Sequence, residues 1–347
     1  MPMALMLVSC IFLYLGCLSA AGYDDIEEKI VHVGDPVTLS CYTDPENVDP
    51  SKITWKTHGN IVARISNGKL TSDCGYEGRV QISKSIAKGD LSLTIHRTVY
   101  NDFGEYECWY NGEHKTAWSL KITANIPKKL EVTAGDPVSI PCFTRQNKGS
   151  QKGMMSEDIS FEWKKDEKSV LRVERGGIMD KADEVDFSDD VHNGNLSLII
   201  AQAFFSDRGT YRCNGDIDVT CLLVVSGHKK RREVSLEDRL SLQLYTVDPV
   251  IVYFQRDHYS TPVIVCNGSQ CSPGWIYVKN GHKVELNTVT RDHIGIYTVR
   301  DRQSDELLCT YNVQVTTSEG VYIHNIVHVV YFFLVSIISI ILASPSP

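Results

Sequence analysis

The sequence predicts an all-β fold of tandem two-layer sandwiches, and three observations lead to that prediction. Segments such as Val37–Cys41 and Leu91–Ile95 alternate apolar and polar residues, which is the period of a strand with one buried face. A motif of the form D-x-G-x-Y-x-C occurs at Asp102–Cys108 and again at Asp207–Cys213. The chain also has 11 cysteines, and persistent disulfides are typical of secreted rather than cytosolic proteins.

Length and charge limit the classes of function. A chain of 347 residues is expected to form two or three domains. The formal net charge of −8 argues against a nucleic-acid-binding surface, which requires a basic face.

The N-terminus has the pattern of a signal peptide over residues 1–22. An apolar run is followed by the small residues Ser19-Ala20-Ala21-Gly22, as at a cleavage site. The alternatives are a first buried strand or a membrane anchor. Cleavage would remove Cys10 and Cys17 and leave nine cysteines.

Two domains are expected at 24–124 and 126–226, because the same pattern occurs twice. The strand that opens the first domain ends at Cys41, and its counterpart ends at Cys142, 101 positions later. The cysteines of the two D-x-G-x-Y-x-C motifs are 105 positions apart. A repeat of both ends at nearly one period indicates duplicated domains.

These motifs resemble the immunoglobulin superfamily, and the long middle of each domain resembles its variable type. The resemblance implies a disulfide across each sandwich with a tryptophan packed against it. It also implies a tyrosine corner, in which a Tyr two residues before the second cysteine bonds back to nearby backbone, and an Asp with a structural role. The corresponding residues are Cys41–Cys108 with Trp55, Cys142–Cys213 with Trp163, Asp102 with Tyr106, and Asp207 with Tyr211. Arg79 fits the family's usual partner of Asp102.

A third domain, at 234–317, is expected to be a degenerate and truncated sandwich. The family pattern would place one core strand at 261–266, ending at Cys266, and the next at 274–278 with Trp275. A corner with Asp292 and Tyr297 follows, but Val299 stands where the second cysteine is expected. We therefore expect Cys309 to pair with Cys266 or Cys271.

The remaining cysteines cannot all pair within one chain. Outside the first two bridges stand Cys74, Cys221, Cys266, Cys271 and Cys309. This odd number implies a free thiol or a bond to a second molecule, either another protein or a second copy.

A basic segment at 227–233 is expected to be the linker before the third domain. It contains Lys229-Lys230-Arg231-Arg232. Three interpretations are open: a solvated linker, a convertase cleavage site after Arg232, or a patch for an anionic glycan.

The C-terminus indicates attachment to a membrane at the cell surface. Residues 326–343 are almost entirely apolar, and no basic residue follows them. Small residues around Ser318, a spacer and an apolar tail occur in the order of a glycolipid-anchor (GPI) signal, with Ser318 as the anchor residue. A membrane helix and a buried strand are the alternatives.

No catalytic, metal-binding or cofactor-binding motif is present, so an enzyme is not expected. Two sequons, at Asn195 and Asn267, predict N-glycosylation. The long polar loop 146–158 is either a recognition loop or a tolerated insertion.

The resemblance implies recognition of a protein ligand, or of a counter-receptor on another cell, by the first domain. Trp109 and Tyr110 come just after Cys108, and His114 is expected in the loop that follows. Aromatic side chains often dominate binding energy, so these three are the predicted contact residues. The alternatives are homophilic adhesion and a secreted or shed decoy for a cytokine or receptor.

Overall fold

The computed structural model describes residues 26–316 apart from 73–74, 147–156 and 158. The predicted signal peptide, Cys74, most of the 146–158 loop, Ser318 and the apolar tail lie outside the described residues. The described chain is all-β, as predicted, with helical turns only of the 3-10 type. Within it no helix is long and apolar enough to cross a membrane.

The chain divides into two compact units. The first unit holds the first sandwich and most of the second. The second unit holds the third sandwich and, from the second, its first strand, the end of its last strand and the turns beside them. Its segments are 129–138, 200–210 and 222–347.

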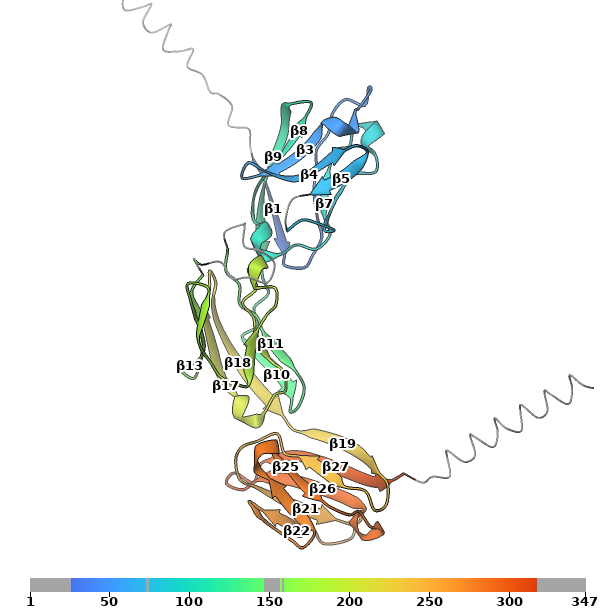
Figure 1. Ribbon diagram of the computed structural model, residues 1–347, viewed down its shortest axis with the longest axis vertical. Coiled ribbons are helices and arrows are strands. Elements are labelled where there is room, and N and C mark those ends of the chain that lie inside the picture. Colours follow the sequence, from blue (N-terminus) through green and yellow to red (C-terminus); the bar gives the residue numbers. More distant parts are fainter. Residues whose placement is uncertain (1–25, 73–74, 147–156, 158, 317–347) are drawn as a thin grey trace, which may run out of the picture. The chain divides into compact units, whose positions relative to one another are not determined.

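The first sandwich has nine strands in two sheets (Figure 1). One sheet has the order β1-β9-β8-β3-β4-β5 and the other β2-β7-β6. The first strand, β1, pairs in parallel with the last, β9. The elements are β1 (Glu27–His32), β2 (Val37–Leu39), η1 (Pro50–Lys52), β3 (Ile53–Thr57), β4 (Asn60–Ser66), β5 (Lys69–Ser72), β6 (Val80–Ile82), η2 (Ile86–Lys88), β7 (Leu93–Ile95), η3 (Tyr100–Asp102), β8 (Gly104–Tyr110) and β9 (Glu113–Thr123).

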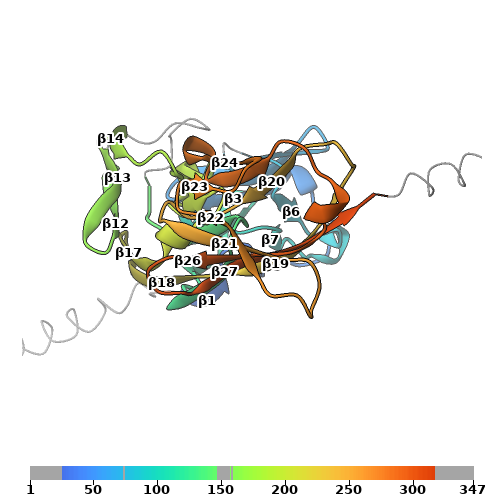
Figure 2. The same ribbon diagram turned by 90° about the horizontal axis from the view of Figure 1, so that it is seen from below.

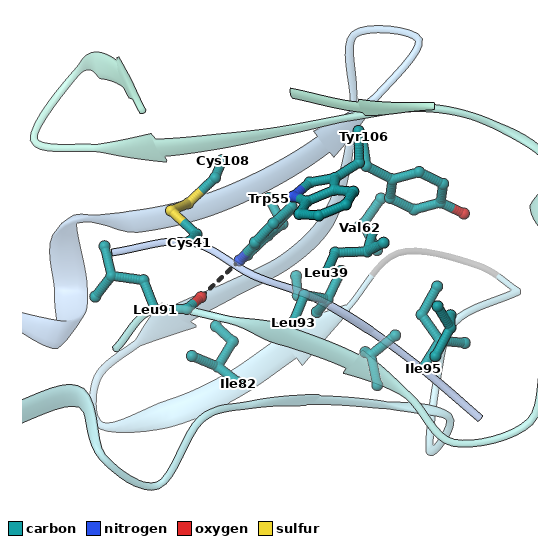
Figure 3. Close-up of a cluster of buried hydrophobic side chains, with 14 of the residues drawn as sticks. Leu39, Cys41, Trp55, Val62, Ile82, Leu91, Leu93, Ile95, Tyr106 and Cys108 are labelled. Atoms are coloured by element: carbon teal, nitrogen blue, oxygen red, sulfur yellow. Dashed lines mark hydrogen bonds between the residues drawn. A yellow bond between two sulfur atoms is a disulfide. The ribbon is translucent and has the colours of Figure 1, made fainter. Parts of the chain in front are cut away.

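A disulfide and a tryptophan occupy the centre of this sandwich (Figure 3). Strand alternation buries every second side chain, so Trp55 on β3 and Cys108 on β8 face inward as a direct pair. Cys108 is bonded to Cys41 across the two sheets. The Trp55 indole is fully buried, and its Nε1 donates to the carbonyl of Leu91 at 2.9 Å. Because that donor is satisfied, burial of the indole leaves no unpaired polar group.

The corner before β8 is held by an ion pair between the partly buried Arg79 and the buried Asp102. Two hydrogen bonds join the guanidinium to the carboxylate, at 2.7 and 2.9 Å, and Asp102 is only 2% exposed. The Tyr106 hydroxyl donates to the carbonyl of Asp102 at 2.7 Å, which is the tyrosine-corner bond. Burial is the main cause that raises the pKa of Tyr106 well above its usual value. Asp102 thus has the structural role that the family resemblance implies.

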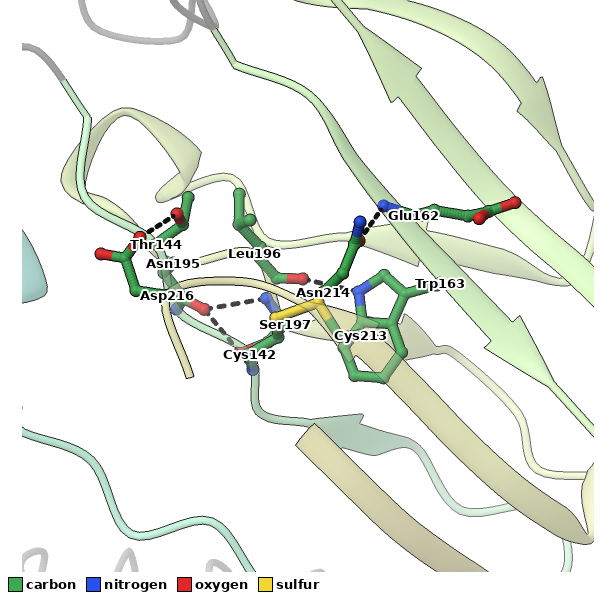
Figure 4. Close-up of a disulfide and its surroundings, with 10 residues drawn as sticks. All are labelled: Cys142, Thr144, Glu162, Trp163, Asn195, Leu196, Ser197, Cys213, Asn214 and Asp216. Carbon is green, nitrogen blue, oxygen red and sulfur yellow. Dashed lines mark hydrogen bonds between the residues drawn. A yellow bond between two sulfur atoms is a disulfide. The ribbon is translucent and has the colours of Figure 1, made fainter. Parts of the chain in front are cut away.

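The second sandwich repeats the topology of the first, with sheets β10-β18-β17-β12-β13-β14 and β11-β16-β15. Cys142 is bonded to Cys213, and the Nε1 of buried Trp163 donates to the carbonyl of Leu196 at 2.9 Å (Figure 4). Its elements are β10 (Lys129–Thr133), β11 (Val138–Ile140), β12 (Phe161–Lys165), β13 (Lys168–Glu174), β14 (Gly177–Lys181), β15 (Val185–Phe187), η4 (Val191–Asn193), β16 (Leu198–Ile200), η5 (Phe205–Asp207), β17 (Gly209–Asn214) and β18 (Asp218–Ser226).

The third sandwich is complete, so the expectation of a truncated one is wrong. Its sheets, β19-β27-β26-β21-β22-β23 and β20-β25-β24, follow the same order as the other two; Figure 2 shows its strands in colours from yellow to red. Its elements are β19 (His228–Val234), β20 (Leu240–Gln243), β21 (Val250–Gln255), β22 (Val263–Asn267), β23 (Gln270–Cys271), β24 (Trp275–Val278), η6 (Lys279–Gly281), β25 (Lys283–Leu286), η7 (Arg291–His293), β26 (Gly295–Asp301) and β27 (Leu307–Val315).

The prediction placed the core strands of this sandwich too late in the chain. Val252 on β21 pairs with Val299, as Trp55 pairs with Cys108, and the register of β20 puts Leu244 in the place of Cys41. Trp275 lies on β24 in the opposite sheet, where it packs on Tyr297 at 5.3 Å between ring centroids. Aliphatic side chains thus replace the central disulfide and tryptophan, and the sequence markers for those strands are missing.

The predicted bond from Cys309 to Cys266 or Cys271 is also wrong. Cys266 and Cys271 are bonded to each other, because they stand directly opposite on β22 and β23 with Cα atoms 4.0 Å apart. Cys309 lies on β27, with β26 and β21 between it and β22. It is a buried free thiol.

The basic segment 227–233 is mostly strand rather than linker. His228–Val234 form β19, which pairs in parallel with β27 over seven residues. A hydrogen-bonded strand is not an open linker, so the interpretation as a linker is wrong.

One corner residue is also corrected. The place of Asp102 is taken by His293, which caps η7 through its Nδ1, whereas Asp292 pairs with exposed Arg256 at 3.0 Å. The Tyr297 hydroxyl still donates to the His293 carbonyl at 2.8 Å.

Candidate functional site: the outer face of the first sandwich

The site lies on the outer face of the six-stranded sheet of the first sandwich. On β8, Tyr106 and Cys108 point into the core, so Glu105, Glu107 and Trp109 point away from it. The β8–β9 hairpin closes through Asn111 and Gly112, whose φ angles are 52° and 82°. A two-residue hairpin turn with two positive φ angles favours Asn followed by Gly, and the twist of such a turn matches that of the flanking strands. The outward residues are therefore held on a rigid hairpin.

Trp109 lies near the hairpin end of β8, is half-buried and contacts three other side chains on this face. Its Nε1 donates to Glu107 Oε2 at 2.8 Å. The Lys56 ammonium lies 4.8 Å from the ring centroid, and the His114 ring meets the indole edge-on at 5.4 Å. A cation over an indole at an exposed site contributes roughly 0.5–1 kcal/mol. These contacts favour one orientation of the indole.

Tyr110 does not join this cluster. Its ring packs partly against the core, and its hydroxyl accepts a hydrogen bond from the backbone N–H of Asp49 at 3.0 Å. Tyr110 therefore anchors the loop before β3. Of the three predicted contact residues, the structure brings together only Trp109 and His114.

Sequence reasoning missed Lys56 and Glu107, the charged neighbours of Trp109. The signal was available, because both residues stand next to an inward-facing member of the core, Trp55 or Cys108, and must point outward. What the sequence does not show is that β3 and β8 are adjacent in the sheet.

The matching face of the second sandwich has a different character. Asn214 follows Cys213 there as Trp109 follows Cys108, and its side chain accepts from the Glu162 backbone N–H at 2.7 Å (Figure 4). A hollow of about 310 Å³ on this face is lined mainly by polar and charged residues, Lys164 and Arg212 among them. The aromatic cluster around Trp109 has no counterpart at this position.

The two sequons lie in different settings. Asn195 Oδ1 accepts from the backbone N–H and the hydroxyl of Ser197, just as Asp90 Oδ1 accepts from those of Ser92 in the first sandwich. Asn195 thus stabilises a turn. Asn267 lies at the end of β22, beside the Cys266–Cys271 bridge.

The described residues contain no group of three or more His, Cys, Asp or Glu side chains that could hold a metal ion. Trp109, Lys56, Glu107 and His114 offer contact area, charge and hydrogen bonds.

Comparison with known proteins supports the same fold. Residues 27–122 match the family model of the immunoglobulin V-set domain. The chain is 32% identical over 117 residues to the Hepatitis A virus cellular receptor 1 homolog of Rattus norvegicus, covering 27% of this chain and 34% of that protein. It is 24% identical over 196 residues to the muscle M-line assembly protein unc-89 of Caenorhabditis elegans, covering 55% of this chain and 2% of that protein.

Two solved structures match with low TM-scores. Tim-1 matches 29% of this chain and 96% of its own at 24% identity, with a TM-score of 0.25. A marsupial T cell receptor matches 82% and 98% at 17% identity, also with a TM-score of 0.25. TM-scores this low carry no argument about function. The V-set match makes the first sandwich an immunoglobulin domain, and its nine-strand topology recurs in the second and third sandwiches.

Proposed function

We propose that this protein is a cell-surface recognition molecule that binds a protein ligand, or a counter-receptor on another cell, through the outer face of its first sandwich. The observation that supports this most is the pre-ordered Trp109 cluster on that face. Trp is enriched among the residues that dominate protein interfaces, especially where neighbouring side chains limit access of water. Lys56 and Glu107 place both signs of charge beside the indole, which favours a partner of mixed charge.

The test is binding of the soluble protein, residues 23–316, to cells or to a panel of surface proteins. Trp109→Ala is expected to weaken binding about 30-fold or more, since a central interface Trp contributes about 2 kcal/mol or more. Tyr42→Ala is the control, because Tyr42 is an aromatic of the same domain that is 67% exposed and outside the cluster. Unchanged binding by Trp109→Ala, with its melting temperature retained, would refute the proposal.

The name of the rat relative describes a cellular receptor, which supports the receptor class for this chain. We propose that the C-terminal tail attaches the protein to the outer leaflet through a glycolipid at Ser318. The alternative is a membrane helix at 326–343. Phospholipase C treatment of expressing cells distinguishes the two, because it releases only the lipid-anchored form.

Two other modes of action remain as alternatives. Homophilic adhesion predicts concentration-dependent self-association of the soluble protein. A decoy predicts a shed form that captures a cytokine or receptor. A disulfide-linked partner or homodimer would need an accessible thiol; Cys309 is only 1% exposed and cannot supply one. N-glycosylation at Asn195 and Asn267 stays a prediction, and glycopeptide mass spectrometry measures its occupancy at each site.

A further inference from the structure

A buried imidazole lies in the second unit, where the third sandwich meets the turns at the end of the second. His228 is the first residue of β19, stands opposite Cys309 on β27, and is 7% exposed. Its ring meets the rings of Tyr245 and Tyr311 edge-on, at 5.1 and 5.3 Å. Its Nε2 is 3.2 Å from the Tyr311 hydroxyl, and its Nδ1 is 3.8 Å from Cys309 Sγ.

Tyr245 links this cluster to the turns at 134–136 and 203–205. The Tyr245 ring lies so close to Gly135 that a Cβ there would come within 2.6 Å of it. The carbonyl of Tyr245 accepts from the backbone N–H of Phe205 at 2.8 Å, and the Phe204 ring lies 6.1 Å away. His228 itself bonds to the backbone of Ala134. The His228 imidazole is therefore part of the contact between the third sandwich and these turns.

The charges around His228 oppose its protonation. From its own strand, Lys230 lies 3.3 Å from the Tyr245 hydroxyl, and Arg232 lies over the Tyr311 ring. The Asp136 carboxylate faces it from the 134–136 turn and favours the charged form, as does the Ala134 backbone. From β27 it is faced by the Cys309 thiol, whose pKa burial raises to about 12, so this group is neutral.

Burial and the two cations lower the pKa of His228 to about 4, from a usual value of 6.5. Because this pKa is depressed in the folded protein, the neutral form stabilises the contact above pH 6.5. That stabilisation is lost as the pH falls from 6.5 towards 4.

We propose that the contact made by His228 and Tyr245 is an acid-sensitive joint, which opens when His228 is protonated. The chain would then hold this joint closed at the neutral pH of the cell exterior and loosen it in an acidified compartment. Opening would expose the turns at 134–136 and 203–205 without breaking the disulfides of the first two sandwiches.

The test is hydrogen exchange of residues 129–138 and 200–210 in the soluble protein, corrected for intrinsic rates, at about pH 7.5 and about pH 5. The two pKa values predict that the opening equilibrium constant rises about 30-fold at the lower pH. His228→Gln, which stays neutral, is expected to remove that rise. His258→Gln, at an exposed histidine of the third sandwich, is the control and is expected to keep it.

Equal opening constants at the two pH values in the unmodified protein would overturn the proposal. So would a pH dependence that persists in His228→Gln, because another titrating group, such as His282 packed on Phe204, would then be responsible. If His228→Gln does not fold, an NMR titration of His228 in the unmodified protein decides. A pKa at or above the ordinary value would contradict the joint.

Discussion

Removal of the Arg79 guanidinium is expected to cost the first sandwich a large part of its stability. In Arg79→Met the Asp102 carboxylate, 2% exposed, loses its two charge-assisted bonds of 2.7 and 2.9 Å. The backbone N–H of Val99 still donates to it at 2.8 Å, but no cation remains beside it. Breaking a buried ion pair from one side costs about 3–5 kcal/mol, because the other charge is left buried without its partner. A domain of this size has only about 5–15 kcal/mol in total.

The assay is equilibrium unfolding of the soluble protein, with the fluorescence of the first sandwich followed separately from the others. Arg79→Met/Asp102→Asn should recover part of the loss, because the neutral amide costs less to bury. Arg64→Met, at an exposed arginine of β4, is the control and should change stability by less than about 0.5 kcal/mol. A loss of under about 1 kcal/mol in Arg79→Met would show that the ion pair is not what holds the corner.

Two further predictions concern the bridges and the turns. Replacing Cys41 and Cys108 together by Ala is expected to cost about 4 kcal/mol in equilibrium unfolding, the loop-entropy value for a separation of 67 residues; a loss under about 1 kcal/mol would contradict it. Gly135→Ala is expected to lower the melting temperature more than Gly34→Ala. Both glycines have φ near +90°, but only at Gly135 would the new Cβ meet the Tyr245 ring. Equal losses would mean that this ring can move aside at little cost.

The first two sandwiches and their central disulfides could be predicted from the sequence because the residues that mark them lie in short local motifs. The period-two strands, the tryptophans and the D-x-G-x-Y-x-C motifs each lie within a few residues of the position they specify. The central bridges Cys41–Cys108 and Cys142–Cys213 join residues that those motifs name. Apolar alternation and turn chemistry agree there, so one assignment satisfies both.

The third sandwich was misassigned because its core uses residues without a distinctive signature. Leu244, Val252 and Val299 fill the volume that a disulfide and an indole fill elsewhere, and aliphatic residues are present in every strand. Cys266 and Trp275 then served as false markers, although they belong to β22 and β24. Which aliphatic residues form such a core depends on how their volumes fit together, and this fit cannot be derived from the sequence pattern alone.

The site was predicted in part for a related reason. Alternation after Cys108 places Trp109 on the outer face, and this needs no knowledge of the neighbouring strands. Placing Lys56 over the indole requires the adjacency of β3 and β8, which is set by the topology of the sheet. The anchoring role of Tyr110 likewise depends on where the loop at Asp49 comes to lie.

The parallel pairing of first and last strands has a mechanical consequence. In each sandwich a pull on the two ends loads these ladders along the strands, so that their six, five and seven paired positions must yield together. Once the ladders fail, Cys41–Cys108 and Cys142–Cys213 prevent the residues between them from stretching. In the third sandwich the Cys266–Cys271 bridge closes a loop of only a few residues. Under tension, nearly all of its residues can therefore extend, whereas the bridges of the other two sandwiches prevent this.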